Sequence, residues 1–152
     1  MDLAVEHAGH SARADELIDV GGLAADLAGL AAGRSGGERE LRFVVAQRLK
    51  SALAEGRAKA EQLLLKDKHG RRCAERLCRM EDELVRLLFD FARLHLYPST
   101  NPSEAERMAI VATGGYGRGL QAPGSDIDLL FVLPYKQTAW GESIAEAILY
   151  CL

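Results

Sequence analysis

Apolar residues recur at steps of three and four through the middle of the chain, between residues 41 and 97. This spacing places apolar side chains on one side of a helix. The first stripe consists of Leu41, Val44, Val45, Leu49, Leu53, Ala60, Leu63 and Leu64. The pattern is interrupted at residues 68–70, where Gly70 is well placed to end a helix.

A second stripe follows this break and predicts a second helix. It consists of Leu77, Leu84, Leu87, Leu88, Phe91 and Leu94, and we expect the opposite face to carry Glu75, Arg79, Glu81, Glu83 and Arg86. The helix should end before Tyr97 and Pro98, because a residue that precedes proline is pushed out of the helical region. Residues 41–97 are therefore predicted to form an antiparallel helical hairpin.

The pattern changes beyond residue 97. Residues 108–113 are short, apolar and β-branched, which predicts a buried strand, and residues 125–133 predict a second strand with acids at its leading end. Residues 141–152 show helical spacing again, and we expect this last helix to be uncapped and without a core to pack on. The predicted class is α+β, a helical hairpin followed by the start of an incomplete sheet over residues 98–152.

The first forty residues are rich in alanine and glycine and end in a linker-like stretch at residues 33–37. A short helix over residues 15–30 would be weakened by Gly21, Gly22 and Gly29. We therefore expect residues 1–40 to be a flexible or loosely ordered extension.

Charge and length narrow the class of protein. The 152 residues suit one domain, and the net charge of −3 lacks the basic excess typical of nucleic-acid binders. No apolar run reaches the ~18–20 residues of a membrane helix, and the acidic start does not resemble a signal peptide. We expect a cytoplasmic protein that binds neither nucleic acid nor membrane.

Three cysteines, Cys73, Cys78 and Cys151, are present, an odd number without a Cys-x-x-Cys spacing. They are predicted to be reduced, mostly buried thiols rather than zinc ligands.

Asp126 and Asp128 are the candidates for metal chemistry. Residues i and i+2 of a strand point to the same face, so both carboxylates should lie together while Ile127 points into the core. Paired carboxylates repel one another unless a cation lies between them, and their oxygens suit Mg²⁺ or Mn²⁺. A bare Asp-x-Asp also fits two acids that merely face solvent.

Glycines next to the first strand strengthen the metal interpretation. Gly114 and Gly115 would leave backbone N–H groups open to a close approach by phosphate. Arg118 could pair with a phosphate, and Ser125 offers a hydroxyl at the same edge. Each feature alone also fits an ordinary turn, but their order along the chain is specific.

The order of a strand, two glycines, ten residues and an Asp-x-Asp strand resembles the DNA polymerase β-like nucleotidyltransferase superfamily. The longer string GGYGRGLQAPGSDIDLLFVLPYK is similar to the N-terminal nucleotidyltransferase domain of the bacterial PII-protein uridylyltransferases. The resemblance covers about residues 41–152.

The resemblance implies that Asp126 and Asp128 are catalytic and ligate Mg²⁺, or Mn²⁺, bound to UTP. Gly114, Gly115, Arg118 and Ser125 would hold the triphosphate, and a tyrosine of the PII signal-transduction protein would receive UMP. In this family a further domain hydrolyses the uridylyl group, and other domains sense glutamine, which regulates nitrogen metabolism. None of those domains, nor the superfamily's third catalytic acid, falls within residues 1–152, so this chain is expected to be truncated and inactive alone.

Two other interpretations stay open at this point. The chain could belong to an adenylyltransferase of the same superfamily, although those acting on glutamine synthetase lack the Gly-Tyr-Gly-Arg turn. It could also be a non-catalytic helical docking module, built on residues 41–97, with a vestigial nucleotide motif.

Overall fold

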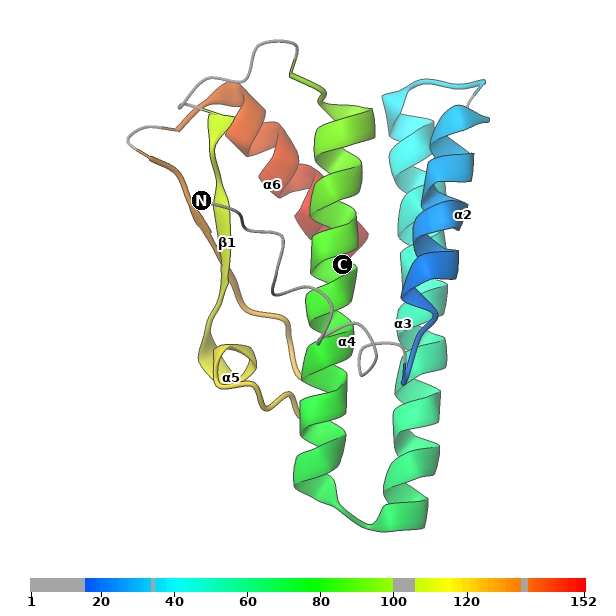
Figure 1. Ribbon diagram of the computed structural model, residues 1–152. Coiled ribbons are helices and arrows are strands. Elements are labelled where there is room, and N and C mark those ends of the chain that lie inside the picture. The colour runs from blue at the N-terminus through cyan, green and yellow to red at the C-terminus, as the bar shows by residue number, and fades with distance from the viewer. Residues whose placement is uncertain (1–15, 34, 100–105, 135–136) are drawn as a thin grey trace, which may run out of the picture.

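Two long antiparallel helices form the frame of the computed structural model (Figure 1). The structure describes residues 16–33, 35–99, 106–134 and 137–152. Helix α3 spans Glu38–Asp67, and α4 spans Gly70–Phe91 and continues as a π-helical turn, η1, over Ala92–Leu96. The predicted hairpin is confirmed, and the helical path ends before Tyr97 and Pro98 as expected.

The turn between α3 and α4 differs in detail from the prediction. Lys68 adopts the left-handed conformation with a φ of 54°, and its N–H donates to the carbonyl of Leu64. Gly70 instead begins α4. The left-handed position that usually favours glycine is therefore occupied by lysine, two residues earlier than predicted.

Residues 20–32 form a packed helix, α2 (Val20–Ala32), rather than part of a loose extension. Asp19 caps this helix by accepting a hydrogen bond from the N–H of Gly22 at 2.8 Å. Leu23 and Leu27, one helical turn apart, are fully buried in the core. Burial of these leucines against the hairpin outweighs the low helix propensity of the glycines. The sequence prediction gave that propensity too much weight. Residues 1–15 lie outside the described residues.

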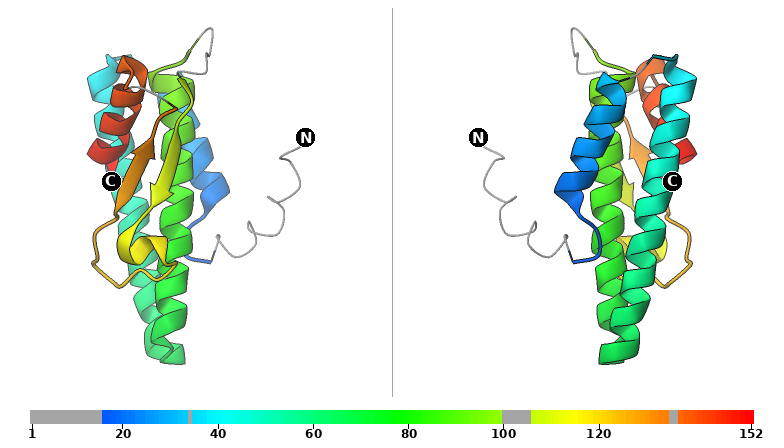
Figure 2. Two further views of the ribbon diagram at one scale, coloured as in Figure 1. Left: turned by 90° about the vertical axis from the view of Figure 1, so that its left-hand side faces the viewer. Right: turned by 90° about the vertical axis from the view of Figure 1, so that its right-hand side faces the viewer.

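The sheet has two antiparallel strands, β1 (Ala109–Ala112) and β2 (Leu129–Val132), which lie along α4 on the side away from α2 (Figures 1 and 2). The inward face carries Ile110 and Phe131, which pair across the strands and pack on the core. The α+β class is confirmed. Both strands are shorter than predicted, because regular pairing stops where the chain turns at Thr113.

Helix α6 (Ala139–Cys151) packs against both α3 and α4, which corrects the expectation of a helix without a core. Thr138 caps it by accepting from the N–H of Gly141 at 3.1 Å. Ile144 and Ile148 are completely buried. Their i, i+4 spacing gives α6 an apolar face that the hairpin covers.

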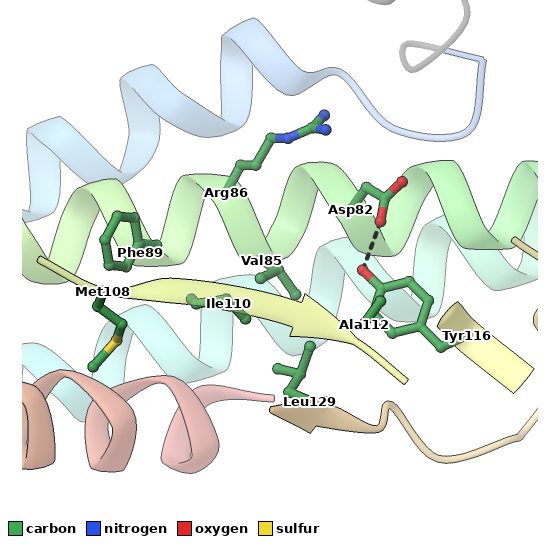
Figure 3. Close-up of a pocket in the computed structure, with 9 residues that line it drawn as sticks. All are labelled: Asp82, Val85, Arg86, Phe89, Met108, Ile110, Ala112, Tyr116 and Leu129. Carbon is green, nitrogen blue, oxygen red and sulfur yellow. Dashed lines mark hydrogen bonds between the residues drawn. The ribbon is translucent and has the colours of Figure 1, made fainter. Parts of the chain in front are cut away.

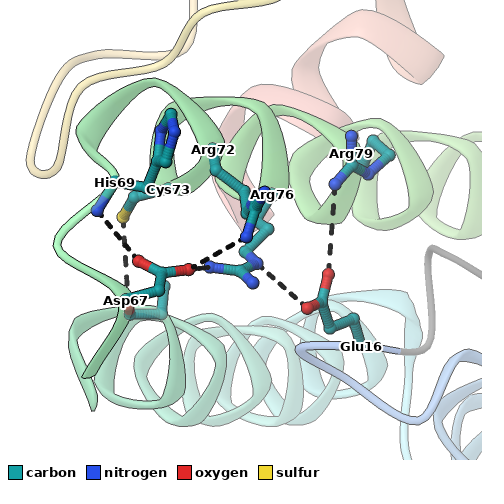
Figure 4. A network of polar contacts seen from close by, with 8 residues as sticks. Glu16, Asp67, His69, Arg72, Cys73, Arg76 and Arg79 are labelled. Carbon is teal, nitrogen blue, oxygen red and sulfur yellow. Dashed lines mark hydrogen bonds and ion pairs between the residues drawn. The ribbon is translucent and has the colours of Figure 1, made fainter. Parts of the chain in front are cut away.

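A network of ion pairs links the segment before α2 to the hairpin (Figure 4). The guanidinium of Arg76, which is largely buried, donates to Asp67 at 2.7 Å and to Glu16 at 3.0 Å. Hydrogen bonds from Arg76 and from the His69 backbone lower the pKa of Asp67. The network fixes the end of α3 to the first turns of α4.

Two further predictions can be compared with the structure. Cys73, Cys78 and Cys151 are all free and buried, as predicted. In the part of the chain that the structure describes, every helix is too short or too polar to span a bilayer.

Candidate functional site

The segment between β1 and β2, residues 113–128, brings the glycine turn and the two aspartates together. Gly114 follows the strand with a φ of +60°, in the region that L side chains rarely adopt. A Cβ at this position would lie 2.4 Å from Oδ2 of Asp128. The carboxylate of Asp128 can therefore lie directly against the turn only because residue 114 has no side chain.

The neighbouring glycines have different surroundings. Gly117 ends the short helix α5 (Gly114–Gly117), and a Cβ there would meet the carbonyl oxygen of Ala112 at 2.6 Å. A Cβ at Gly115 would meet the carbonyl oxygen of Leu120 at 3.5 Å and the guanidinium of Arg118 at 3.9 Å, both ordinary contacts. Gly114 and Gly117 are thus required by the fold of the turn, whereas the fold of the turn would accept a small side chain at Gly115.

Asp126 and Asp128 precede β2 rather than belonging to it, which corrects the prediction of a strand over residues 125–133. The N–H of Thr113 donates to the Asp128 carbonyl at 3.0 Å, so the two chain segments still lie side by side. Both aspartates are exposed, and Ile127 between them is half-buried rather than in the core. Pairing across the sheet ends before this segment, which leaves it less covered than a buried strand.

The carboxylates have the chemistry of a divalent-metal site. Neither makes an ion pair with another described residue, so both are open to a cation. Oxygen ligands suit Mg²⁺ and Mn²⁺. Among the described residues, however, no three His, Cys, Asp or Glu side chains cluster as a metal site, so these two acids supply only part of a ligand set.

The other two predicted residues lie on either side of this turn. Arg118 is exposed, and its guanidinium lies 3.9 Å from where a Cβ of Gly115 would be. Ser125 is half-buried, and its N–H donates to the carbonyl of Ala122 at 3.0 Å in the turn before Asp126. The structure thus places Arg118 at the glycine turn and Ser125 beside the first aspartate.

Tyr116 anchors the glycine turn to α4, which the sequence analysis did not foresee (Figure 3). Its ring is buried, and its hydroxyl donates to Asp82 at 2.8 Å. The thiol of Cys78 donates to the Tyr116 carbonyl at 3.7 Å. A cavity of about 250 Å³ lies next to this contact, between α4 and the inward face of the sheet, where it is bordered by Val85, Phe89 and Ile110.

Gln121 and Glu81 form a second anchor that sequence reasoning missed. Glu81 was predicted on the polar face of its helix, yet only 1% of it is exposed. Burial raises its pKa to about 7, and attraction to Arg57, at 3.8 Å, opposes this effect. Gln121 is 2% exposed, although the residues around it in the turn are exposed. Gln121 stands alone between exposed loop residues, so no periodic pattern in the sequence could have indicated that it is buried.

A comparison with protein families assigns the class of this site. Residues 101–150 match the family model described as "Nucleotidyltransferase domain". The matched region contains the glycine turn, both aspartates and all of α6 except Cys151. The chain therefore carries a nucleotidyltransferase domain sequence, in agreement with the motif that the fold brings together.

Curated relatives assign a narrower group. The chain is 59% identical over 143 residues to the bifunctional uridylyltransferase/uridylyl-removing enzyme of Bradyrhizobium diazoefficiens. It is 57% identical over all 152 residues to the enzyme of that name from Nitrobacter hamburgensis. The matches cover 94% and 100% of this chain but only 15% and 16% of those relatives. The chain is a homologue of the bifunctional uridylyltransferase/uridylyl-removing enzymes, of whose length it spans about one sixth. No solved structure matches it.

Proposed function

We propose that residues 114–128 form the triphosphate and metal end of a UTP site in a protein uridylyltransferase that acts in the cytoplasm. The supporting observation is the contact between Gly114 and Asp128. This contact places a carboxylate beside a turn that has no side chain at Gly114 or Gly115. A nucleoside triphosphate carries its divalent cation on its phosphates, so a site for it needs carboxylates and phosphate donors side by side.

Each residue has a defined task in this proposal. Asp126 and Asp128 hold Mg²⁺ or Mn²⁺, which when bound neutralises phosphate charge and orients the triphosphate. The lack of a side chain at Gly115 lets a phosphate approach the backbone, and Arg118, beside it, is placed to pair with that phosphate. Ser125 offers its hydroxyl next to Asp126. The remaining ligands and the groups that bind the base would come from parts of the protein beyond these residues.

The proposed reaction transfers UMP to a tyrosine of a PII signal-transduction protein. The tyrosine hydroxyl oxygen bonds to the α-phosphorus of UTP, the bond from that phosphorus to the bridging oxygen breaks, and pyrophosphate leaves. The hydroxyl proton passes to solvent. The names of the relatives support uridylyl transfer, and glutamine control and uridylyl removal are proposed for the longer protein only.

Calorimetric titration with UTP and with ATP, each with and without Mg²⁺, tests this proposal. The 152-residue chain would be compared with a version extended to the whole nucleotidyltransferase domain. We expect Mg²⁺-dependent binding of UTP in preference to ATP by the extended version. Preference for ATP would refute the uridylyl assignment, and silence from both chains would favour a docking module without catalysis.

The aspartate pair has its own prediction. Asp126→Asn with Asp128→Asn should abolish the Mg²⁺-dependent part of UTP binding, since amide oxygens carry no charge to attract the cation. A matched control is Asp90→Asn, because Asp90 is an exposed acid on α4. Undiminished Mg²⁺-dependent binding by the double variant would show that these carboxylates are not metal ligands.

A further inference from the structure

Gln121 connects the body of the protein to the aspartate pair through its side chain. Its amide nitrogen donates to the carbonyl of Asp126 at 2.9 Å and to that of Ser125 at 3.4 Å. Its own backbone N–H donates to the carbonyl of Ala74 in α4 at 3.3 Å. One residue therefore ties the start of the aspartate segment to the helix on which it rests.

The aspartate segment is held at two points along its backbone. Gln121 holds the peptide groups of Ser125 and Asp126, and Thr113 holds the carbonyl of Asp128 at 3.0 Å. Only Ile127 lies between the two points. The backbone sets the direction of the Cα–Cβ bond, so these hydrogen bonds fix where the side chains of both aspartates leave the chain.

Glu81, on α4, is buried like Gln121. The approach of the Gln121 amide is among the effects that lower the Glu81 pKa, against the larger effect of burial. Burying these two polar side chains lowers the stability of the fold. One oxygen of Glu81, Oε2, has no hydrogen-bond partner among the described residues. An apolar pair of similar volume would be no less stable at such a position. An apolar side chain at position 121, however, could not donate to the two carbonyls.

We propose that Gln121 is a positioning residue that orients Asp126 and Asp128 for the metal-bound triphosphate. This inference rests on the proposed function of the aspartate pair. It means that metal and triphosphate binding also require a residue outside the glycine and aspartate motif, at the contact between the loop and α4.

The variant Gln121→Met tests this role, because methionine keeps the length of the side chain and removes the amide group that donates to the two carbonyls. Gln62→Met, at an exposed position of α3, is the matched control. Mg²⁺-dependent UTP affinity would be measured in whichever of the two chains described above binds UTP. We expect Gln121→Met to weaken the Mg²⁺-dependent affinity about tenfold or more, the size found for groups that orient metal ligands. Hydrogen exchange across residues 122–128 should become faster, and Gln62→Met should change neither quantity.

The double variant Gln121→Met with Glu81→Leu separates positioning from stability. It replaces the buried polar pair by an apolar one, so it should be at least as stable as the wild type and still bind Mg²⁺ and UTP weakly. It also keeps the test available if Gln121→Met alone fails to fold. Wild-type affinity in a folded variant that lacks the Gln121 amide would overturn the positioning role alone. If the wild type shows no Mg²⁺-dependent UTP binding in either chain, the proposed function fails, and the positioning role fails with it.

Discussion

The buried carboxyl of Glu81 should make the stability of this protein fall as the pH rises through neutrality. Glu81 is 1% exposed, and burial raises its pKa from 4.5 to about 7. The folded chain therefore binds the Glu81 proton more tightly than the unfolded chain does. The stabilisation is fully present below about pH 4.5 and is lost as the pH rises through about 7.

The size of the effect follows from the two pKa values. Each pKa unit corresponds to about 1.4 kcal/mol, so the difference between 4.5 and about 7 amounts to about 3 kcal/mol in total. Most of this difference, about 2–3 kcal/mol, falls between pH 5 and pH 8. The attraction of Arg57 is already contained in the pKa, and it is weak at 3.8 Å with a side chain 40% exposed.

Glu81→Gln removes the titrating group and keeps its shape. Urea unfolding followed by circular dichroism at pH 5, 6, 7 and 8 would give the free energy of unfolding of both proteins. The variant should gain on the wild type by about 2–3 kcal/mol between the two extremes, because all other titrating groups cancel in the difference. Glu61→Gln, on the exposed face of α3, is the matched control and should show no such gain. Parallel curves for wild type and Glu81→Gln would refute a strongly raised Glu81 pKa.

Three further changes test the anchoring of the site and of the hairpin. Gly114→Ala should lower the free energy of unfolding by about 1–2 kcal/mol because of the left-handed backbone, and it should weaken Mg²⁺-dependent UTP binding by displacing Asp128. Gly115→Ala, measured by the same unfolding and calorimetry, should fold normally. Tyr116→Phe removes the hydrogen bond to Asp82 and should lower the free energy of unfolding by about 1–2 kcal/mol, and an unchanged value would argue against this anchor. Arg76→Met should destabilise the chain at pH 7 and do so less in acid, where Asp67 becomes protonated. Equal losses at pH 3 and pH 7 would contradict the ion pair.

The sequence predicted elements well where one periodic face decides the structure. The leucines of α3 and α4 recur with helical spacing, and the hairpin follows from their burial. Prediction failed where a few buried contacts outweigh local propensity. The glycines of α2 suggested disorder, but burial of Leu23 and Leu27 against the hairpin stabilises that helix. Likewise Lys68, rather than Gly70, takes the left-handed turn.

In the candidate site, too, the sequence predicts one group of residues and misses another. The glycines and aspartates could be found from sequence because their spacing carries the chemistry, and the contact between Gly114 and Asp128 joins them in space. Their support could not be found, because Gln121 and Glu81 are forty residues apart, and Gln121 stands in an exposed turn without a periodic pattern. Their role depends on a loop folding back onto α4, where a buried amide reaches the backbone of Asp126. A motif search alone would therefore transfer the two carboxylates to any relative and overlook the residue that sets their direction.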